Sequence, residues 1–136
     1  MKKLTREWIR KAEADHRTAS ALSGHVPPLN DGVSFHCQQC VEKYLKALLE
    51  ELGLGVPKTH DLDHLLTLLK SHYPQLRSLR RGLLFLSDYA VEIRYPSNWT
   101  TRRQAQAAQR WADRVRTMVR SLLGIWPRPP RGTKSP

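Results

Sequence analysis

The sequence predicts an all-α protein, an up-and-down bundle of four long helices and one short helix. Apolar residues recur at intervals of three and four along most of the chain, which is the period of a helix buried on one side. Gly, Pro and Thr residues stand between these stretches, where helices end or begin. The 136 residues suffice for one domain with a core. We expect a bundle over residues 1–124 and a basic, Pro-rich, flexible tail over 125–136.

The first helix is predicted over residues 5–23, with Thr5 as its N-cap and Gly24 at its end. Its apolar stripe has a carboxylate in the middle, at Asp15. A carboxylate in a core stripe is costly unless it is paired, so Asp15 either reaches water at the stripe's edge or pairs across the bundle. The candidate partners are three cations: Lys43, Lys46 and Arg94.

The central helix is predicted over residues 32–52, after a loop. Asn30 or Asp31 can cap its start, and Gly53 ends it. Its apolar stripe is Cys37, Val41, Tyr44, Leu45, Leu48, Leu49 and Leu52.

The opposite face of this helix has a continuous polar stripe, since residues three and four apart are neighbours. The stripe is Gln39, Glu42, Lys43, Lys46 and Glu50. One interpretation is a solvated face with a single intrahelical pair, Glu42–Lys46. The other is a polar site that faces a groove.

Three further segments complete the predicted bundle. A short helix over about residues 60–71 begins after Thr59, which can cap it. A long helix runs from Pro74 to position 93, and Gly82 within it indicates a close helix crossing. Its apolar positions are Leu76, Leu79, Leu83, Leu86, Ala90 and Ile93.

The last helix is expected to start at Thr100 or Thr101 and to close at Gly124, with Trp111 filling space where the bundle opens.

Positive charge is concentrated in the last helix. The formal net charge is +11, and residues 100–123 contain six arginines but a single acidic residue, Asp113. Such a surface attracts polyanions without reading sequence. The predicted nucleic-acid patch is Arg102, Arg103, Arg110 and Arg114. The alternative is an ordinary exposed helix face, because Arg is a good helix former.

No cofactor, metal site or membrane span is expected. Cys37 and Cys40 lie one turn apart on an apolar helix face, which favours buried reduced thiols over a metal site. His60 and His64 lack a third ligand at suitable spacing. No uninterrupted apolar run reaches membrane-spanning length, and the N-terminus moves straight into an amphipathic helix, so we expect a cytoplasmic protein.

Three motifs, in this order and spacing, resemble the HEPN family. They are Gln-Gln-x-x-Glu-Lys-x-x-Lys-Ala over residues 38–47, Pro-Lys-Thr-His-Asp-Leu over 57–62, and Arg-Tyr-Pro over 94–96. The resemblance covers most of the chain and implies a helical bundle, often a homodimer, with a nucleotide-related role.

Many HEPN proteins are metal-independent ribonucleases, several of them toxins of toxin–antitoxin systems. Their motif is an Arg followed, after four to six residues, by a His. Arg94 matches the Arg, but positions 99–101 are Trp, Thr and Thr, and no His follows His72. A divergent ribonuclease would need Glu42 or Asp15 as the base for the 2′-hydroxyl proton.

The other branch of the family resembles the substrate-binding domains of small nucleotidyltransferases and is commonly encoded beside a minimal nucleotidyltransferase. The motifs of this chain are similar to that branch. The resemblance implies a non-catalytic partner that binds a nucleotide or RNA. Its ligand-binding residues would be Arg94, Tyr95, Lys43, Lys46, Glu42, Gln39 and Asp15. A third hypothesis is a structural dimerisation module in which these residues form a buried ion network without a ligand.

Overall fold

The computed structural model describes residues 1–91 and 96–125. These residues form helices and no strands, and the predicted all-α class is confirmed. The elements are α1 (Lys3–Ser23), α2 (Asn30–Glu51), α3 (Leu62–Leu69), the 3₁₀-helix η1 (Pro74–Leu79), α4 (Arg80–Ser87) and α5 (Arg102–Leu122).

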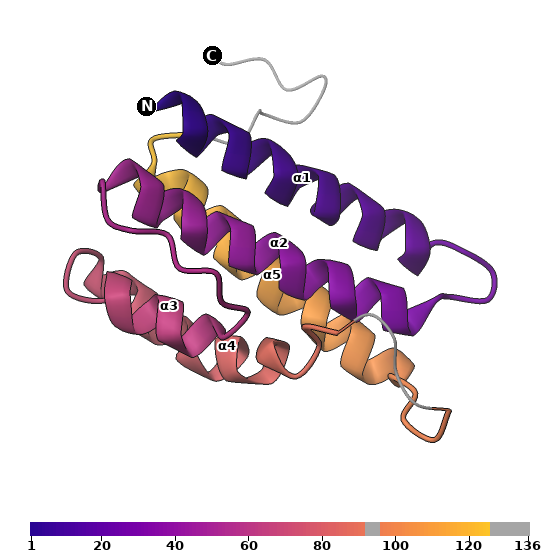
Figure 1. The fold of residues 1–136 in the computed structure, drawn as a ribbon. Helices are drawn as coiled ribbons and strands as arrows, with labels where there is room; N and C mark the ends of the chain where they lie inside the picture. Colours follow the sequence, from indigo (N-terminus) through magenta and orange to yellow (C-terminus); the bar gives the residue numbers. More distant parts are fainter. Residues whose placement is uncertain (92–95, 126–136) are drawn as a thin grey trace, which may run out of the picture.

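Three long helices lie side by side over a layer of short ones (Figure 1). α1 and α2 form an antiparallel hairpin, whereas α5 runs parallel to α2. Ser34 meets Thr100 near the start of both helices, with 3.2 Å between their hydroxyl oxygens. Tyr44 and Arg120 meet farther along, at 3.3 Å. α2 contacts α1, α3, α4 and α5, which makes it the centre of the fold.

The connector between α2 and α3 runs back along the bundle, so that α3 starts beside the middle of α2 (Figure 1). Two contacts fix this path. The backbone oxygen of His60 accepts a hydrogen bond from Gln38 Nε2 at 3.3 Å, and its imidazole meets Glu42 at 2.8 Å. Residues before α3 are thereby placed over the polar stripe of α2.

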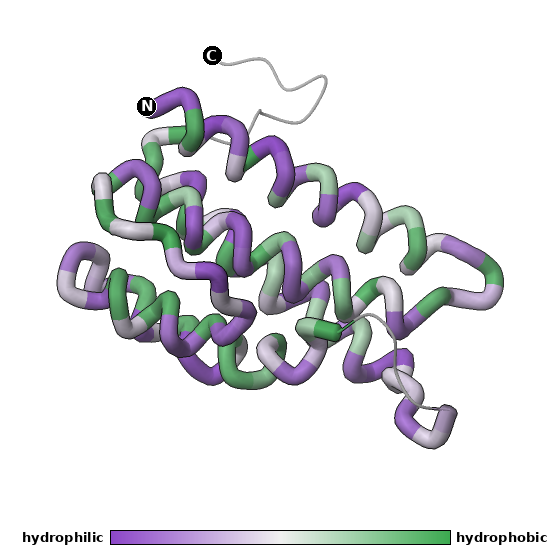
Figure 2. Tube along the Cα trace, viewed as in Figure 1, coloured by the Kyte–Doolittle hydropathy of each residue, from purple (hydrophilic) through white to green (hydrophobic). Residues whose placement is uncertain are grey.

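Hydrophobic and hydrophilic residues alternate along every helix, as expected for helices buried on one side (Figure 2). The predicted apolar stripe of the central helix is buried from Cys37 to Leu49 and partly buried at Leu52. Its largest fully buried members are Tyr44, Leu45, Leu48 and Leu49.

The helix ends differ from the prediction in three places. Thr5 does not cap α1, which begins at Lys3; its buried hydroxyl instead donates to Glu51 Oε1 at 3.0 Å. The start of α2 has no side-chain cap, because the Asp31 carboxylate accepts the Thr100 N–H at 2.7 Å. Asp61, rather than Thr59, caps α3.

Other predicted helix ends are confirmed. Thr101 forms a capping box with Gln104 at the start of α5. Gly53 and Gly124 both have φ of +74°, the left-handed conformation that ends helices at low cost to glycine.

The fourth predicted helix is divided and shorter than expected. Residues 74–79 form a 3₁₀-helix, and α4 ends at Ser87. The apolar positions 76, 79, 83 and 86 are buried as predicted. Residues i and i+3 also share a side of a 3₁₀-helix, so apolar spacing did not distinguish the two forms. The predicted end at Ile93 to Tyr95 lies outside the described residues, as do residues 126–136 of the predicted tail.

α4 crosses α5 at Gly82, and the predicted close approach is confirmed. A Cβ placed on Gly82 would lie 2.1 Å from Cε3 of Trp111. The indole therefore covers the glycine at the crossing, instead of filling an opening of the bundle.

Candidate functional site

The centre of the polar stripe of α2 is buried at Glu42 and Lys46 and its other members are half-buried, which overturns its interpretation as a solvated face. Only 4% of Glu42 and 6% of Lys46 is exposed, and Gln38 beside them is fully buried. Glu42 accepts hydrogen bonds from Lys46 Nζ at 3.1 Å and Gln38 Nε2 at 3.2 Å, and its other contact is His60 Nδ1 at 2.8 Å. Its carboxylate is therefore fully engaged under the connector.

Asp15 is the centre of a second buried pair. It is 8% exposed, so it does not reach water at the edge of its stripe. Its carboxylate pairs with Lys43 and meets His36 Nδ1 at 2.8 Å. The predicted pairing across the bundle is confirmed, with Lys43 as the partner.

A third cluster joins α1 to α5. Glu13 accepts two hydrogen bonds from Arg116, at 2.6 and 2.7 Å, and one from Arg120 at 3.2 Å. Burial alone would raise the pKa of Glu13. The hydrogen bonds and the positive charge of Arg116 outweigh this effect of burial, and the pKa falls from 4.5 to about 2. Arg120 also donates a hydrogen bond to the hydroxyl of Tyr44. Burial raises the pKa of that hydroxyl.

These contacts change the expected ligand set. Lys43 and Lys46 each have a carboxylate partner, and Gln39 donates its amide to Gln38 Oε1 at 2.7 Å. Neither lysine is free to neutralise a phosphate. Arg94 and Tyr95, the remaining members of the set, lie outside the described residues.

Both cysteines are free and buried, as predicted. Burial is the main reason that the pKa of Cys37 rises to about 12, and burial also raises the pKa of Cys40. No group of three or more potential metal ligands occurs in the described part of the chain. No described helix is long and apolar enough to cross a membrane.

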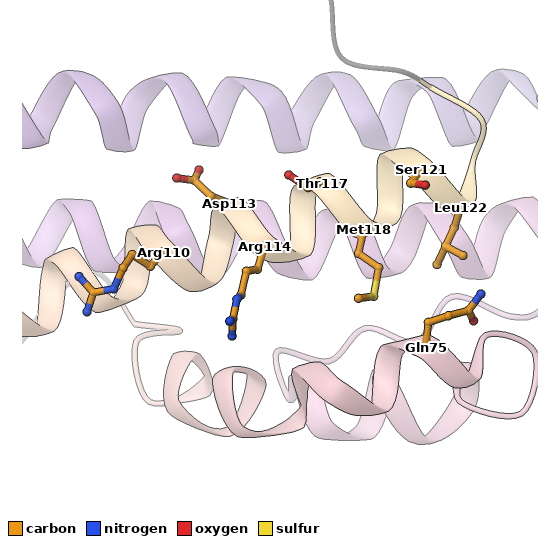
Figure 3. Close-up of a pocket in the computed structure, with 8 residues that line it drawn as sticks. All are labelled: Gln75, Arg110, Asp113, Arg114, Thr117, Met118, Ser121 and Leu122. Carbon is orange, nitrogen blue, oxygen red and sulfur yellow. The ribbon is translucent and has the colours of Figure 1, made fainter.

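An open groove of about 740 Å³ lies between α5 and η1. Arg110, Arg114 and Met118 extend from α5, and Gln75 of η1 lies across from Leu122 (Figure 3). The groove is further lined by Asp113, Thr117 and Ser121. The guanidinium of Arg114 lies 5.0 Å from the centre of the Trp111 ring, a cation–π contact.

The groove is positively charged. Its acid, Asp113, is directed towards α1, where His16 Nε2 is 2.9 Å from its carboxylate (Figure 3). No carboxylate of residues 1–91 or 96–125 forms an ion pair with Arg110 or Arg114, and both arginines are exposed. Within the described part of the chain, no carboxylate therefore compensates their charge.

The six arginines of α5 lie on different sides of the helix and have different surroundings. Eleven residues make about three helical turns, so Arg103 shares a side with Arg114, and Arg110 lies between them. Arg102 shares its side with Asp113, on the flank that meets α1. Arg116 and Arg120 are bound to Glu13. We call Arg103, Arg110 and Arg114 the arginine row.

A second hollow, of about 540 Å³, was not predicted as a site. Its rim includes Leu22, Leu29 and Trp99, and it lies where the loop before α2 meets the corner before α5. Trp99 is 74% exposed, which is unusual for the largest apolar side chain. In the sequence, Trp99 closely follows Pro96, which predicts a turn, and a Trp in a turn is a signal from which an exposed position could have been predicted.

Comparisons with known proteins identify a matching family and two crystal structures with a similar fold. The profile described as HEPN domain matches residues 5–122. None of the curated proteins matches at a significant level. The fold is similar to the crystal structure of TT1696 from Thermus thermophilus, with 25% identity and a TM-score of 0.76 over 86% of this chain and 96% of that one. It also resembles ST0689, an archaeal HEPN homologue, with 24% identity and a TM-score of 0.72 over 90% of this chain and 99% of that one.

Proposed function

This chain belongs to the HEPN domain family, and from that premise we propose that it is a non-catalytic HEPN module. In this proposal it binds the phosphates of a nucleotide or nucleic acid and works as the partner of a minimal nucleotidyltransferase, in a toxin–antitoxin-like pair.

One observation carries the binding part of the proposal. Arg110 and Arg114 line the groove of α5 without a carboxylate partner among the described residues. Arg is suited to phosphate because its planar guanidinium donates several hydrogen bonds and stays charged. Lys43 and Lys46, in contrast, are already neutralised by Asp15 and Glu42.

Two features argue for a module without catalysis. Positions 99–101, where a His would complete the ribonuclease motif with Arg94, hold Trp, Thr and Thr. Asp15 and Glu42, the carboxylates that could replace that His as a base, are each hydrogen-bonded to a lysine and a histidine. The oxygens of both carboxylates are therefore already occupied by partners within the fold, whereas a general base has to face the proton that it removes.

The hollow at Trp99 supports the partner part of the proposal. An exposed Trp beside a concave, partly apolar surface is typical of a protein interface. We propose this surface as the one that meets the nucleotidyltransferase. A Trp99→Ala variant should elute separately from the nucleotidyltransferase in size-exclusion chromatography while the wild type co-elutes; co-elution of both would refute the assignment of this surface.

Titration calorimetry tests the binding part, with common nucleotides and a short RNA, on the wild type and the Arg110→Gln/Arg114→Gln double variant. We expect heat with the wild type and a loss of most of it in the double variant. Lys43→Gln is the comparison on α2. If only Lys43→Gln lost binding, the binding site would have to be assigned to the polar stripe of α2 instead.

RNA recovered from the same mixtures, kept in a chelator, tests the two rival functions. Cleavage by the wild type that disappears in Arg94→Ala would establish a divergent ribonuclease. Neither binding nor cleavage would favour the structural module, for which the ion pairs of Asp15 and Glu42 are the specific observation. Sedimentation then measures whether that module is a homodimer.

A further inference from the structure

We infer that the ligand of the α5 groove is a single-stranded nucleic acid that runs along the arginine row, rather than a mononucleotide or a duplex. This inference rests on the proposed binding function and names the class of ligand that the groove takes.

The length of the arginine row is the first argument. Arg103 and Arg114 are eleven residues apart on α5, which corresponds to about 16 Å along the helix axis. Arg110 lies about 6 Å before Arg114 on the same side. A mononucleotide places all its phosphates at one point of such a row and leaves the rest of the charge unused. A strand presents one phosphate after another and can meet all three arginines.

The apolar floor of the groove is the second argument. Met118 and Leu122 lie beside the row, with the amide of Gln75 opposite (Figure 3). The flat faces of bases in a single strand are free to contact such a floor, whereas in a duplex these faces are stacked inside the helix. Single-strand binders combine a basic groove with side chains on which bases stack, most often aromatic ones, and in this groove Met118 and Leu122 offer the apolar contact.

Arg114, in addition, is held in place before any ligand binds. Its guanidinium lies 5.0 Å from the Trp111 ring centre, and that ring packs on Gly82 of α4. A cation held over an aromatic face keeps its N–H donors available at the edge of the guanidinium plane. Ordering Arg114 on binding therefore costs less than ordering a free surface arginine.

The same geometry predicts little preference for base sequence. Among the residues that line the groove, Gln75 has the one side-chain amide, the kind of group that can read the edge of a base. The other polar groups of the lining are hydroxyls, guanidinium groups and the paired carboxylate of Asp113. Affinity should come from phosphates and should fall with salt. For a single strand the slope of log affinity against log salt is about −0.7 per neutralised phosphate, so three arginines give a slope of about −2.

Fluorescence anisotropy with a labelled oligouridine of about 12 nucleotides tests the inference, with salt varied from about 50 to about 200 mM. ATP and an RNA duplex of the same length serve as competitors. We expect the oligouridine to bind with a slope of about −2 and to resist ATP. The Arg110→Gln/Arg114→Gln variant should reduce the slope to about −0.7 and weaken binding about tenfold or more.

Arg102 and Arg103 provide a matched control, because they are neighbours in the sequence and face different sides of α5. Arg103→Gln should reduce the slope by about 0.7, whereas Arg102→Gln, with the same change in charge, should leave it unaltered. Arg102 and Arg103 are both exposed, so these two variants should keep the wild-type melting temperature.

Each contrary result has a distinct meaning. Equal binding of ATP, or displacement of the oligouridine by stoichiometric ATP, overturns the single-strand inference and leaves the proposed nucleotide-binding function standing. Tighter binding of the duplex also overturns it. Equal losses in Arg102→Gln and Arg103→Gln overturn it, because binding then reflects net charge alone. Binding of none of the three ligands overturns both the inference and the proposed binding function.

Discussion

Replacing Glu13 with Gln removes the carboxylate that ties α1 to α5. Glu13 accepts three hydrogen bonds from two arginines, and the shortest is 2.6 Å, from Arg116. Gln keeps the size of the side chain but leaves the charges of Arg116 and Arg120 uncompensated. The variant should unfold more easily at neutral pH, and the difference should depend on pH in a defined direction.

The lowered pKa of Glu13 sets the magnitude. A pKa that falls from 4.5 to about 2 corresponds to roughly 3 kcal/mol in favour of the ionised carboxylate. The Glu13 side chain is 20% exposed, so solvent screening reduces this value, and we expect about 2 kcal/mol. Because the folded-state pKa is the lower one, this stabilisation is present above pH 4.5 and is lost as the pH falls towards 2.

Urea unfolding followed by circular dichroism measures the effect for wild type and Glu13→Gln, at neutral pH and at steps down to about pH 2.5. The gap between their free energies of unfolding should be about 2 kcal/mol near neutrality and should shrink steadily below pH 4.5. Glu7→Gln, an exposed carboxylate on the same helix, is the control for charge alone. A gap that stays constant with pH, or one no larger than that of Glu7→Gln, would refute the reasoning.

Three other substitutions test the packing. Gly82→Ala should cost about 2 kcal/mol, since its Cβ would lie 2.1 Å from the Trp111 ring; an unchanged melting temperature would mean that the ring moves aside freely. Glu42→Ala should cost about 3 kcal/mol in urea unfolding, because Lys46 is left buried without its partner, and a cost below about 1 kcal/mol would contradict the buried pair. Thr101→Ala removes the capping box of α5 and should lower stability by about 1 kcal/mol by thermal unfolding, an effect that Thr101→Ser should largely avoid.

Helix positions and core residues were largely predictable from the sequence. Apolar spacing of three and four reports which side of a helix is buried, and the predicted apolar residues of α2 from Cys37 to Leu49 are in the core. The limits of that signal appear at residues 74–79, where a 3₁₀-helix satisfies the same spacing. The signal also does not fix helix ends, because Thr5 and Asp31 have partners in other helices instead of capping their own.

The burial of the polar stripe could not be read from its own spacing. Glu42 is covered because the connector before α3 turns back, and His60 holds it there. Whether a polar face meets water or another segment is decided by the path of the chain, which has no periodic signature. Asp15 was an exception, since its place in an apolar stripe already required a partner.

The arginines of α5 show the same limit for the candidate site. In the sequence, Arg110, Arg114, Arg116 and Arg120 are equivalent positive charges on one helix. The structure separates them through Glu13, which is 103 residues from Arg116 along the chain. Arg116 and Arg120 are thus bound to Glu13, whereas no ion pair among the described residues involves Arg110 or Arg114.

The central claim is that nucleic acid contacts the groove of α5 and not the polar stripe of α2. Photo-crosslinking with an oligonucleotide that carries 4-thiouridine, followed by mass spectrometry of the peptides, tests this claim most directly. We predict crosslinks to residues of α5 around Arg110 to Leu122 and to η1 near Gln75, lost in the Arg110→Gln/Arg114→Gln variant. Crosslinks confined to α2 around Lys43 and Lys46 would contradict the account.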